Sequence, residues 1–159
     1  TDAYSHKIVG YQVAQTMEAI ESIRALQMAL STLGDKDSLN LTHHSDRGIQ
    51  YCSHAYVKLL QDYNIQISMT ENGDPLENAL AERVNGIIKE EYLDAYSIDN
   101  IADAKELLAA VVELYNSERP HMSISNFTPN HVHHSKTKTE RLWKNYYRKQ
   151  NTFVNLLQD

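Results

Sequence analysis

The sequence has 159 residues and a mass of 18.2 kDa, which suits one domain with a core of its own. Hydrophobic residues make up 42% and charged residues 23%, with only 5 Gly and 3 Pro, so a collagen-like, low-complexity or largely disordered chain is excluded. Cys52 is the single cysteine, which excludes an intramolecular disulfide and a cysteine-based zinc site.

The formal charge of −6 and the pI of about 5.7 argue, taken alone, against a nucleic-acid partner. The charge is unevenly distributed, however, because residues 136–150 hold six lysines and arginines against Glu140 alone. A basic end on an acidic body is compatible with DNA at one edge and cations in a carboxylate-rich site, although a solvated helix face explains the same charges. The sequence has no apolar run long enough to span a bilayer and no signal pattern in residues 1–10, so we expect a cytoplasmic protein without a membrane partner.

The first half of the sequence predicts strands that alternate with helices. Residues 7–13 are β-branched and aromatic and follow a polar turn at Ser5 and His6, which predicts a strand leaving a hairpin. Apolar residues at steps of three and four from Thr16 predict an amphipathic helix that ends at Gly34. The elements expected next are a short strand at residues 39–44, a turn at 45–48, a helix capped by Ser53, and a half-buried strand at 65–69.

The second half of the sequence predicts mainly helices. A turn-rich loop at residues 70–75 leads into a helix at 76–92, and a further helix is expected at 100–115. After an irregular stretch, the basic residues 136–149 predict a last helix. We therefore expect an α/β fold with a core at residues 1–135 and a basic C-terminal helical extension at residues 136–159.

Two carboxylates stand out only when they are considered together. Glu82 lies on the polar face of its predicted helix, opposite the apolar face, which by itself is typical of an exposed surface residue. Asp46 follows a predicted strand, where Asp is most often a turn former. The helix and strand predicted between them could bring both to one edge of a sheet. Hard cations such as Mg²⁺ bind one or two carboxylates together with waters and phosphate oxygens, and two such ions support phosphodiester displacement.

The sequence also resembles a known family at three motifs. They are His-His-Ser-Asp-Arg-Gly-Ile-Gln-Tyr at residues 43–51, Asn-Ala-Leu-Ala-Glu-Arg at 78–83, and Tyr-Asn-Ser-Glu-Arg-Pro-His at 115–121. In this order they resemble the catalytic core of bacterial insertion-sequence transposases, which are related to retroviral integrases. The resemblance covers residues 1 to about 133. It implies a ribonuclease H-like mixed sheet flanked by helices, and an Asp-Asp-Glu triad that uses two divalent metal ions to transfer DNA strands.

The resemblance assigns roles to individual residues. Asp46 matches the second aspartate and Glu82 the glutamate of the triad, so both are implied to be catalytic ligands of Mg²⁺ or Mn²⁺. The family's first aspartate lies on a first, central strand upstream of the segment that resembles residues 1–11. Asp2 matches a different aspartate of structural role. We therefore expect a core that lacks the first strand and is inactive as these 159 residues alone.

Other matched positions are implied to contact DNA or to support the site. Lys89 lies two helical turns beyond Glu82, where retroviral relatives have a lysine that touches DNA, although a solvated lysine is the alternative. Asn78 and His44 are further candidates for the DNA-binding surface, with a packing role the stronger alternative for His44. The residues expected to fix a loop near the active edge are Arg119 and His121.

Three functions remain open from the sequence. The leading one is a DNA strand transferase that acts on transposon ends and target DNA. The alternatives are a nuclease of the same fold that only hydrolyses, and a non-catalytic remnant that binds DNA or self-associates. Because a missing central strand would leave backbone groups unpaired on the strands containing Ile8 and Leu41, we expect a homodimer whose interface includes residues 1–13.

Overall fold

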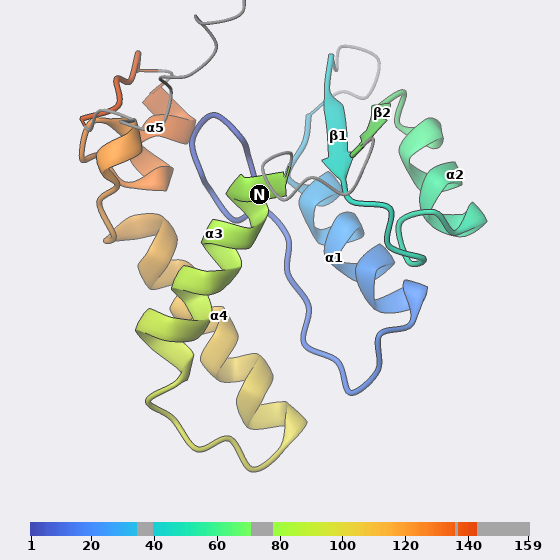
Figure 1. Ribbon diagram of the computed structural model, residues 1–159, viewed down its shortest axis with the longest axis horizontal. Helices are drawn as coiled ribbons and strands as arrows, with labels where there is room; N and C mark the ends of the chain where they lie inside the picture. Colours follow the sequence, from blue (N-terminus) through green and yellow to red (C-terminus); the bar gives the residue numbers. More distant parts are fainter. Residues whose placement is uncertain (35–39, 71–77, 136, 143–159) are drawn as a thin grey trace, which may run out of the picture.

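The computed structural model of the chain describes residues 1–34, 40–70, 78–135 and 137–142. Helices dominate this part of the chain, and the strands form one small sheet (Figure 1). In chain order the elements are α1 (Ala19–Ser31), β1 (Thr42–Ser45), α2 (His54–Asp62), β2 (Gln66–Met69), α3 (Ala79–Ile87), the π-helix η3 (Ile88–Leu93), α4 (Ile101–Ser117), the 3-10 helix η4 (Met122–Ile124) and α5 (Pro129–Ser135).

The sheet in the described part is a parallel pair, β1 and β2, joined by α2. Its register runs from Thr42 opposite Gln66 to Ser45 opposite Met69. A parallel pair needs a crossover connection, and here the helix between the strands provides it. The cap of that helix is the predicted one, because the Ser53 side chain accepts a hydrogen bond from the Tyr56 N–H. The strands predicted at 39–44 and 65–69 are thus confirmed.

The apolar side chains form two core clusters, one in each half of the molecule. One cluster joins α1, α2 and the residue just before β2, and consists of Ile23, Leu26, Leu30, Tyr56, Leu60 and Ile65. The other joins α3, η3 and α4, which run side by side in opposite directions, and consists of Ile8, Val84, Ile87, Ile88, Val111, Val112 and Tyr115 (Figure 1). Helix α5 packs against α4.

The N-terminal segment connects these two halves and differs from the prediction. The turn at Ser5 and His6 is present, with the His6 N–H donating to the Asp2 carbonyl at 2.9 Å, but residues 7–13 are not a strand. Instead the Asn116 side chain of α4 accepts from the Ile8 N–H at 2.9 Å and donates to the Ile8 carbonyl at 3.0 Å. A buried side chain therefore takes the place of a neighbouring strand, and the expectation that Ile8 has unpaired backbone groups is wrong as well.

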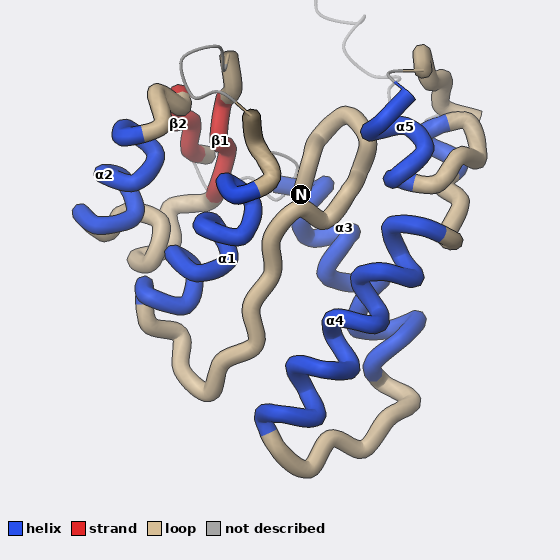
Figure 2. Tube along the Cα trace, turned by 180° about the vertical axis from the view of Figure 1, so that it is seen from behind, coloured by secondary structure: helices blue, strands red, loops and turns tan. Residues whose placement is uncertain are grey.

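The same segment runs between the halves toward α1, as the tube in Figure 2 shows. Ile8 belongs to the cluster of α3 and α4, whereas Gly10 lies against the backbone of α1, where an added Cβ would be 2.1 Å from the Ala25 carbonyl oxygen. Glycine is required here because any side chain would collide with a helix. The segment thus holds the two halves together by contacts on both sides.

Two helix predictions differ from the structure near their ends. The helix predicted at 76–92 is divided into α3 and η3, and residues 76–77 lie outside the described residues. The basic helix predicted at 136–149 is not present in residues 137–142, where the Leu142 N–H donates to the Met122 carbonyl at 2.9 Å, and its remaining residues lie outside the description. The division at residue 135 stays a prediction. Among the described residues, no helix is both long and apolar enough to cross a membrane.

Candidate active site

Asp46 is the first residue beyond β1, at the carboxyl end of the sheet. The sheet ladder continues one step past the strands, because the Thr70 N–H donates to the Ser45 carbonyl at 3.1 Å. The exposed Asp46 carboxylate accepts through Oδ1 from the Gly48 N–H at 2.8 Å, and Arg47 Nε donates to the Thr70 carbonyl at 2.7 Å. The predicted turn therefore orients the carboxylate, and Arg47 ties the turn to the end of β2.

Glu82 lies in the first turn of α3 with its side chain exposed. No cationic side chain or hydrogen-bond donor among the described residues contacts its carboxylate. In Figure 1 the first turn of α3 lies at the same level as the end of β1. The polar face predicted for this helix is confirmed, since Asn85 and Lys89 are exposed whereas Val84 and Ile87 are buried.

The two carboxylates do not by themselves complete a metal site. In the ranges that the structure describes, no group of three or more His, Cys, Asp or Glu side chains is placed to hold a metal ion. Both residues nevertheless offer the hard oxygen ligands that Mg²⁺ and Mn²⁺ prefer, and neither carboxylate is neutralised by an ion pair in that part of the chain. Asp2 does not join them in such a group, and its Oδ1 accepts from the N–H and the hydroxyl of Ser5, each at 2.6 Å, in keeping with a structural role.

The other predicted DNA-contacting residues have different surroundings. His44 is exposed on one face of β1, with Nδ1 2.9 Å from the Ser68 hydroxyl. The packed histidine of this strand is its neighbour His43, whose Nε2 lies 3.0 Å from the Tyr56 hydroxyl, and burial lowers its pKa. Asn78, at the N-terminal boundary of α3, is half-buried and makes no capping hydrogen bond with its side chain. The roles of these residues toward DNA stay predictions.

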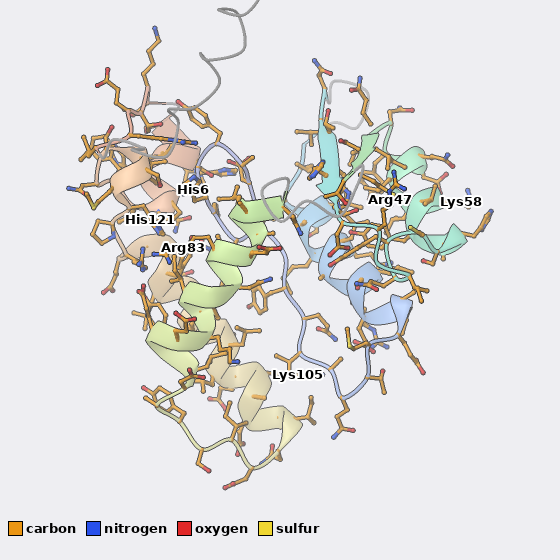
Figure 3. The ribbon with its side chains drawn as sticks, in the orientation of Figure 1. His6, Arg47, Lys58, Arg83, Lys105 and His121 are labelled. Carbon is orange, nitrogen blue, oxygen red and sulfur yellow. The ribbon has the colours of Figure 1, made fainter. Side chains whose placement is uncertain are left out.

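Arg119 and His121 lie in a polar network on the α4 side of the molecule. Arg119 donates from Nε and Nη2 to the two carboxylate oxygens of Glu91, each at 2.7 Å, and its Nη1 lies 3.0 Å from His121 Nδ1. The His121 ring also packs edge-on against the rings of Tyr115 and His6. This geometry ties the loop after α4 to η3. Figure 3 labels His121 and His6 in this half of the molecule, whereas Arg47 and Lys58 lie in the other half.

Glu91 is the member of this network that the sequence reasoning missed. A signal was present, because an ideal helix through Glu82 would place Glu91 about 180° away from it, on the apolar face. A carboxylate on a buried face needs a cationic partner. The partner lies in the loop beyond the next helix, so the helix pattern alone could not identify it.

The network also shifts the pKa values of its members. Hydrogen bonds from Arg119 lower the pKa of Glu91, and burial raises the pKa of Tyr115 to about 12. Burial, reinforced by the positive charge of Arg119, lowers the pKa of His121 to about 4. His121 is therefore neutral near pH 7 and can accept the hydrogen bond from Arg119.

This shift predicts a pH dependence of stability. Between the ordinary pKa of 6.5 and the folded value of about 4, the unfolded chain binds a proton at His121 that the folded chain does not. The stabilisation is complete above the ordinary pKa and is lost as the pH falls through that window. We expect His121→Gln to reduce the fall in the urea midpoint between about pH 7 and about pH 5, relative to wild type and to His54→Gln at the exposed start of α2. Equal falls in all three proteins would contradict the prediction.

Comparison with known proteins extends the resemblance of the motifs. Two family models, both described as an integrase core domain, match this chain. One matches residues 1–75 and the other residues 63–129. A 31 kDa protein of insertion element IS600 from Shigella sonnei is 33% identical over 129 residues, which is 80% of this chain and 47% of that protein. The transposase of insertion sequence IS629 from the same organism is 33% identical over 74% of this chain and 39% of its own length. The chain thus spans about half the length, or less, of these curated relatives.

Solved structures show the fold. The catalytic core domain of HTLV-2 integrase, in a complex with magnesium, aligns with a TM-score of 0.63 at 23% identity, covering 84% of this chain and 81% of that one. The catalytic core of BIV integrase aligns with a TM-score of 0.58 at 20% identity, over 80% of each chain. The predicted α/β, ribonuclease H-like fold is confirmed. Because the two integrase core matches together extend from residue 1 to 129, the chain belongs to the integrase core domain family, and it is similar to the proteins of bacterial insertion sequences.

Proposed function

We propose that this chain is the catalytic core of a DNA strand transferase, in which Asp46 and Glu82 are ligands of divalent metal ions. In this reaction water first cleaves a phosphodiester at a transposon end, and the freed 3′-hydroxyl then attacks target DNA. The observation that carries the proposal is the pair of integrase core matches that together span residues 1–129. Both exposed carboxylates lie within this span, and the motif resemblance implies that they are the acidic ligands.

The donor set favours Mg²⁺ or Mn²⁺, because carboxylate oxygens are the ligands that these ions prefer. When bound, two such ions activate the attacking oxygen and stabilise the leaving oxygen of a phosphodiester. The chain's own residues prepare the site. The Gly48 N–H holds one oxygen of Asp46, which leaves the other oxygen available, and Arg47 secures the turn against the end of β2.

We further propose that these 159 residues alone do not join DNA. The family resemblance implies three carboxylates, and the described residues contain no group of three or more potential metal ligands. The test is incubation of the chain with Mn²⁺ and a labelled transposon-end duplex, alone and preceded by an upstream strand that bears the family's first aspartate. Joined products from the extended protein only would support the proposal. Nicks without joining would favour the nuclease, and DNA retention without metal would favour the non-catalytic remnant.

Lys89 is proposed to contact a DNA phosphate. Its ammonium is exposed and makes no ion pair in the described part of the chain, so it is available to a ligand. We expect Lys89→Ala to weaken binding of a labelled DNA duplex. The negative slope of log affinity against log salt should become shallower by about one, because one phosphate contact releases about one counterion. The control is Lys58→Ala on α2, whose ammonium is engaged by Asp62 at 2.9 Å. Equal slopes for the two variants would make Lys89 an ordinary solvated lysine.

Self-association is the remaining proposed partner interaction. Among the described residues, β1 pairs only with β2, so the opposite edge of β1 carries backbone groups that a second strand can bind. We expect a homodimer in sedimentation velocity at micromolar concentration, with the amides of β1 protected from hydrogen exchange more strongly than in a diluted sample. A monomer at every concentration tested would contradict this expectation.

A further inference from the structure

The helix that carries Glu82 changes its hydrogen-bond pattern before it ends. Helix α3 is regular to Ile87 and then continues as the π-helix η3, in which the Asp94 N–H donates to the Lys89 carbonyl, five residues back, at 2.9 Å. Such turns are rare and short, and they are frequent at functional sites. They also rotate the residues that follow relative to those before, because each turn holds an extra residue. Lys89 is the second residue of η3, and its carbonyl accepts the π-type bond, so the local backbone geometry that carries its side chain depends on η3.

The contact that holds η3 in place comes from Arg119. Both oxygens of Glu91, within η3, accept hydrogen bonds at 2.7 Å from a guanidinium 28 residues further along the chain. The side chain of Arg119 is only 20% exposed and that of Glu91 43%, so the pair is partly shielded from water. A bidentate pair between charged groups is among the stronger hydrogen-bonded contacts and fixes geometry as well as distance. It therefore stabilises the helical register in which it can form.

Arg119 has little capacity left for DNA. Nε and Nη2 are used by Glu91, and Nη1 is directed at His121 Nδ1 at 3.0 Å and at the Pro120 carbonyl at 3.5 Å. His121 is buried, and its lowered pKa keeps it a neutral acceptor near pH 7. The exposed Lys89, two residues before Glu91, is a cation of this region that remains available to a phosphate, as is the exposed Arg83 on α3.

We propose that Arg119 is a positioning residue, which holds the π-helical register of η3 through Glu91 and thereby sets the direction in which Lys89 meets DNA. This inference rests on the proposed function, because it takes Lys89 to be a phosphate contact. It adds a residue that acts on the DNA-binding surface without touching DNA.

The test compares Arg119→Gln with Arg24→Gln, which removes a single Arg–Glu hydrogen bond of 2.6 Å, to Glu21 within α1. In Arg119→Gln we expect the Asp94 amide to exchange about tenfold faster, since it reports opening of η3. We also expect the salt slope of duplex binding to fall by about one, as in Lys89→Ala, and the double variant to show no further fall. Arg24→Gln should change neither quantity.

A conservative variant separates geometry from charge. Arg119→Lys keeps the positive charge but cannot form the bidentate pair, so it should behave like Arg119→Gln in both measurements. The exchanged pair Glu91→Arg with Arg119→Glu should restore slow exchange at Asp94 and the wild-type salt slope. The exchanged pair also keeps the test decisive if Arg119→Gln does not fold.

The other possible results distinguish a failure of the role proposed for Arg119 from a failure of the DNA contact proposed for Lys89. Unchanged exchange at Asp94 in Arg119→Gln would overturn the inference, because η3 would then not depend on the pair. A lowered slope in Lys89→Ala with a wild-type slope in Arg119→Gln would overturn the inference alone. An unchanged slope in Lys89→Ala would show that the proposed DNA contact of Lys89 is itself wrong, and the inference would be rejected with it.

Discussion

Asp46→Asn and Glu82→Gln are each expected to reduce strand transfer at least about a hundredfold, because each removes a charge that is needed around metal and phosphate in the transition state. The assay uses a protein in which this chain follows an upstream strand bearing the family's first aspartate. Joined products are separated from nicked and uncut DNA.

The fold should be nearly unchanged in both variants, because both side chains are exposed. Asn at position 46 keeps a carbonyl Oδ1 that can still accept the one local hydrogen bond of this side chain, from the Gly48 N–H. The matched control is Glu90→Gln, which removes another exposed carboxylate from the same continuous helical segment and should leave joining unaffected. Substantial joining by either site variant would mean that the site assignment is wrong.

Gly10→Ala is expected to destabilise the protein by about 2–3 kcal/mol, the upper part of the range for overpacked sites. The added Cβ would lie 2.1 Å from the Ala25 carbonyl oxygen and 3.0 Å from the Ala29 nitrogen. These are backbone atoms within α1, so the helix cannot make room as a flexible side chain could. The N-terminal segment must then move away from α1 and loosen the contact between the two halves.

Urea unfolding measures this effect, with Gly34→Ala as the matched control. A Cβ at Gly34 meets nothing within 4 Å, so the same chemical change should cost little there. If the two variants unfolded at the same urea concentration, the close packing of the N-terminal segment against α1 would be contradicted.

Much of the fold follows from local sequence patterns. The cap at Ser53, the strand at residues 65–69 and the polar face around Glu82 are all present where they were expected. Each depends on hydrogen bonds or side-chain periodicity among residues close together in the chain. The turn after β1 is similar, because Asp46 is bonded to a backbone N–H only two residues away.

The candidate site was predictable only in part. The motif positions of Asp46, Glu82 and Lys89 can be identified from the sequence, and their roles are the subject of the mutations above. Glu91 was overlooked because helical periodicity treats each helix by itself. Its partner Arg119 follows a different helix, and only packing of α4 beside η3 brings the two side chains together.

The sequence by itself determined α1, α2, α4, the locations of the parallel strands and the acidic positions, because these depend on neighbours along the chain. Tertiary structure alone decided that residues 7–13 are not a strand, since the groups that bond Ile8 belong to Asn116, 108 residues away. It also decided that the helix after Ile87 continues as a π-helix, where Arg119 binds Glu91. In both cases the hydrogen-bond partner lies far away along the chain, so it is not visible in a local pattern.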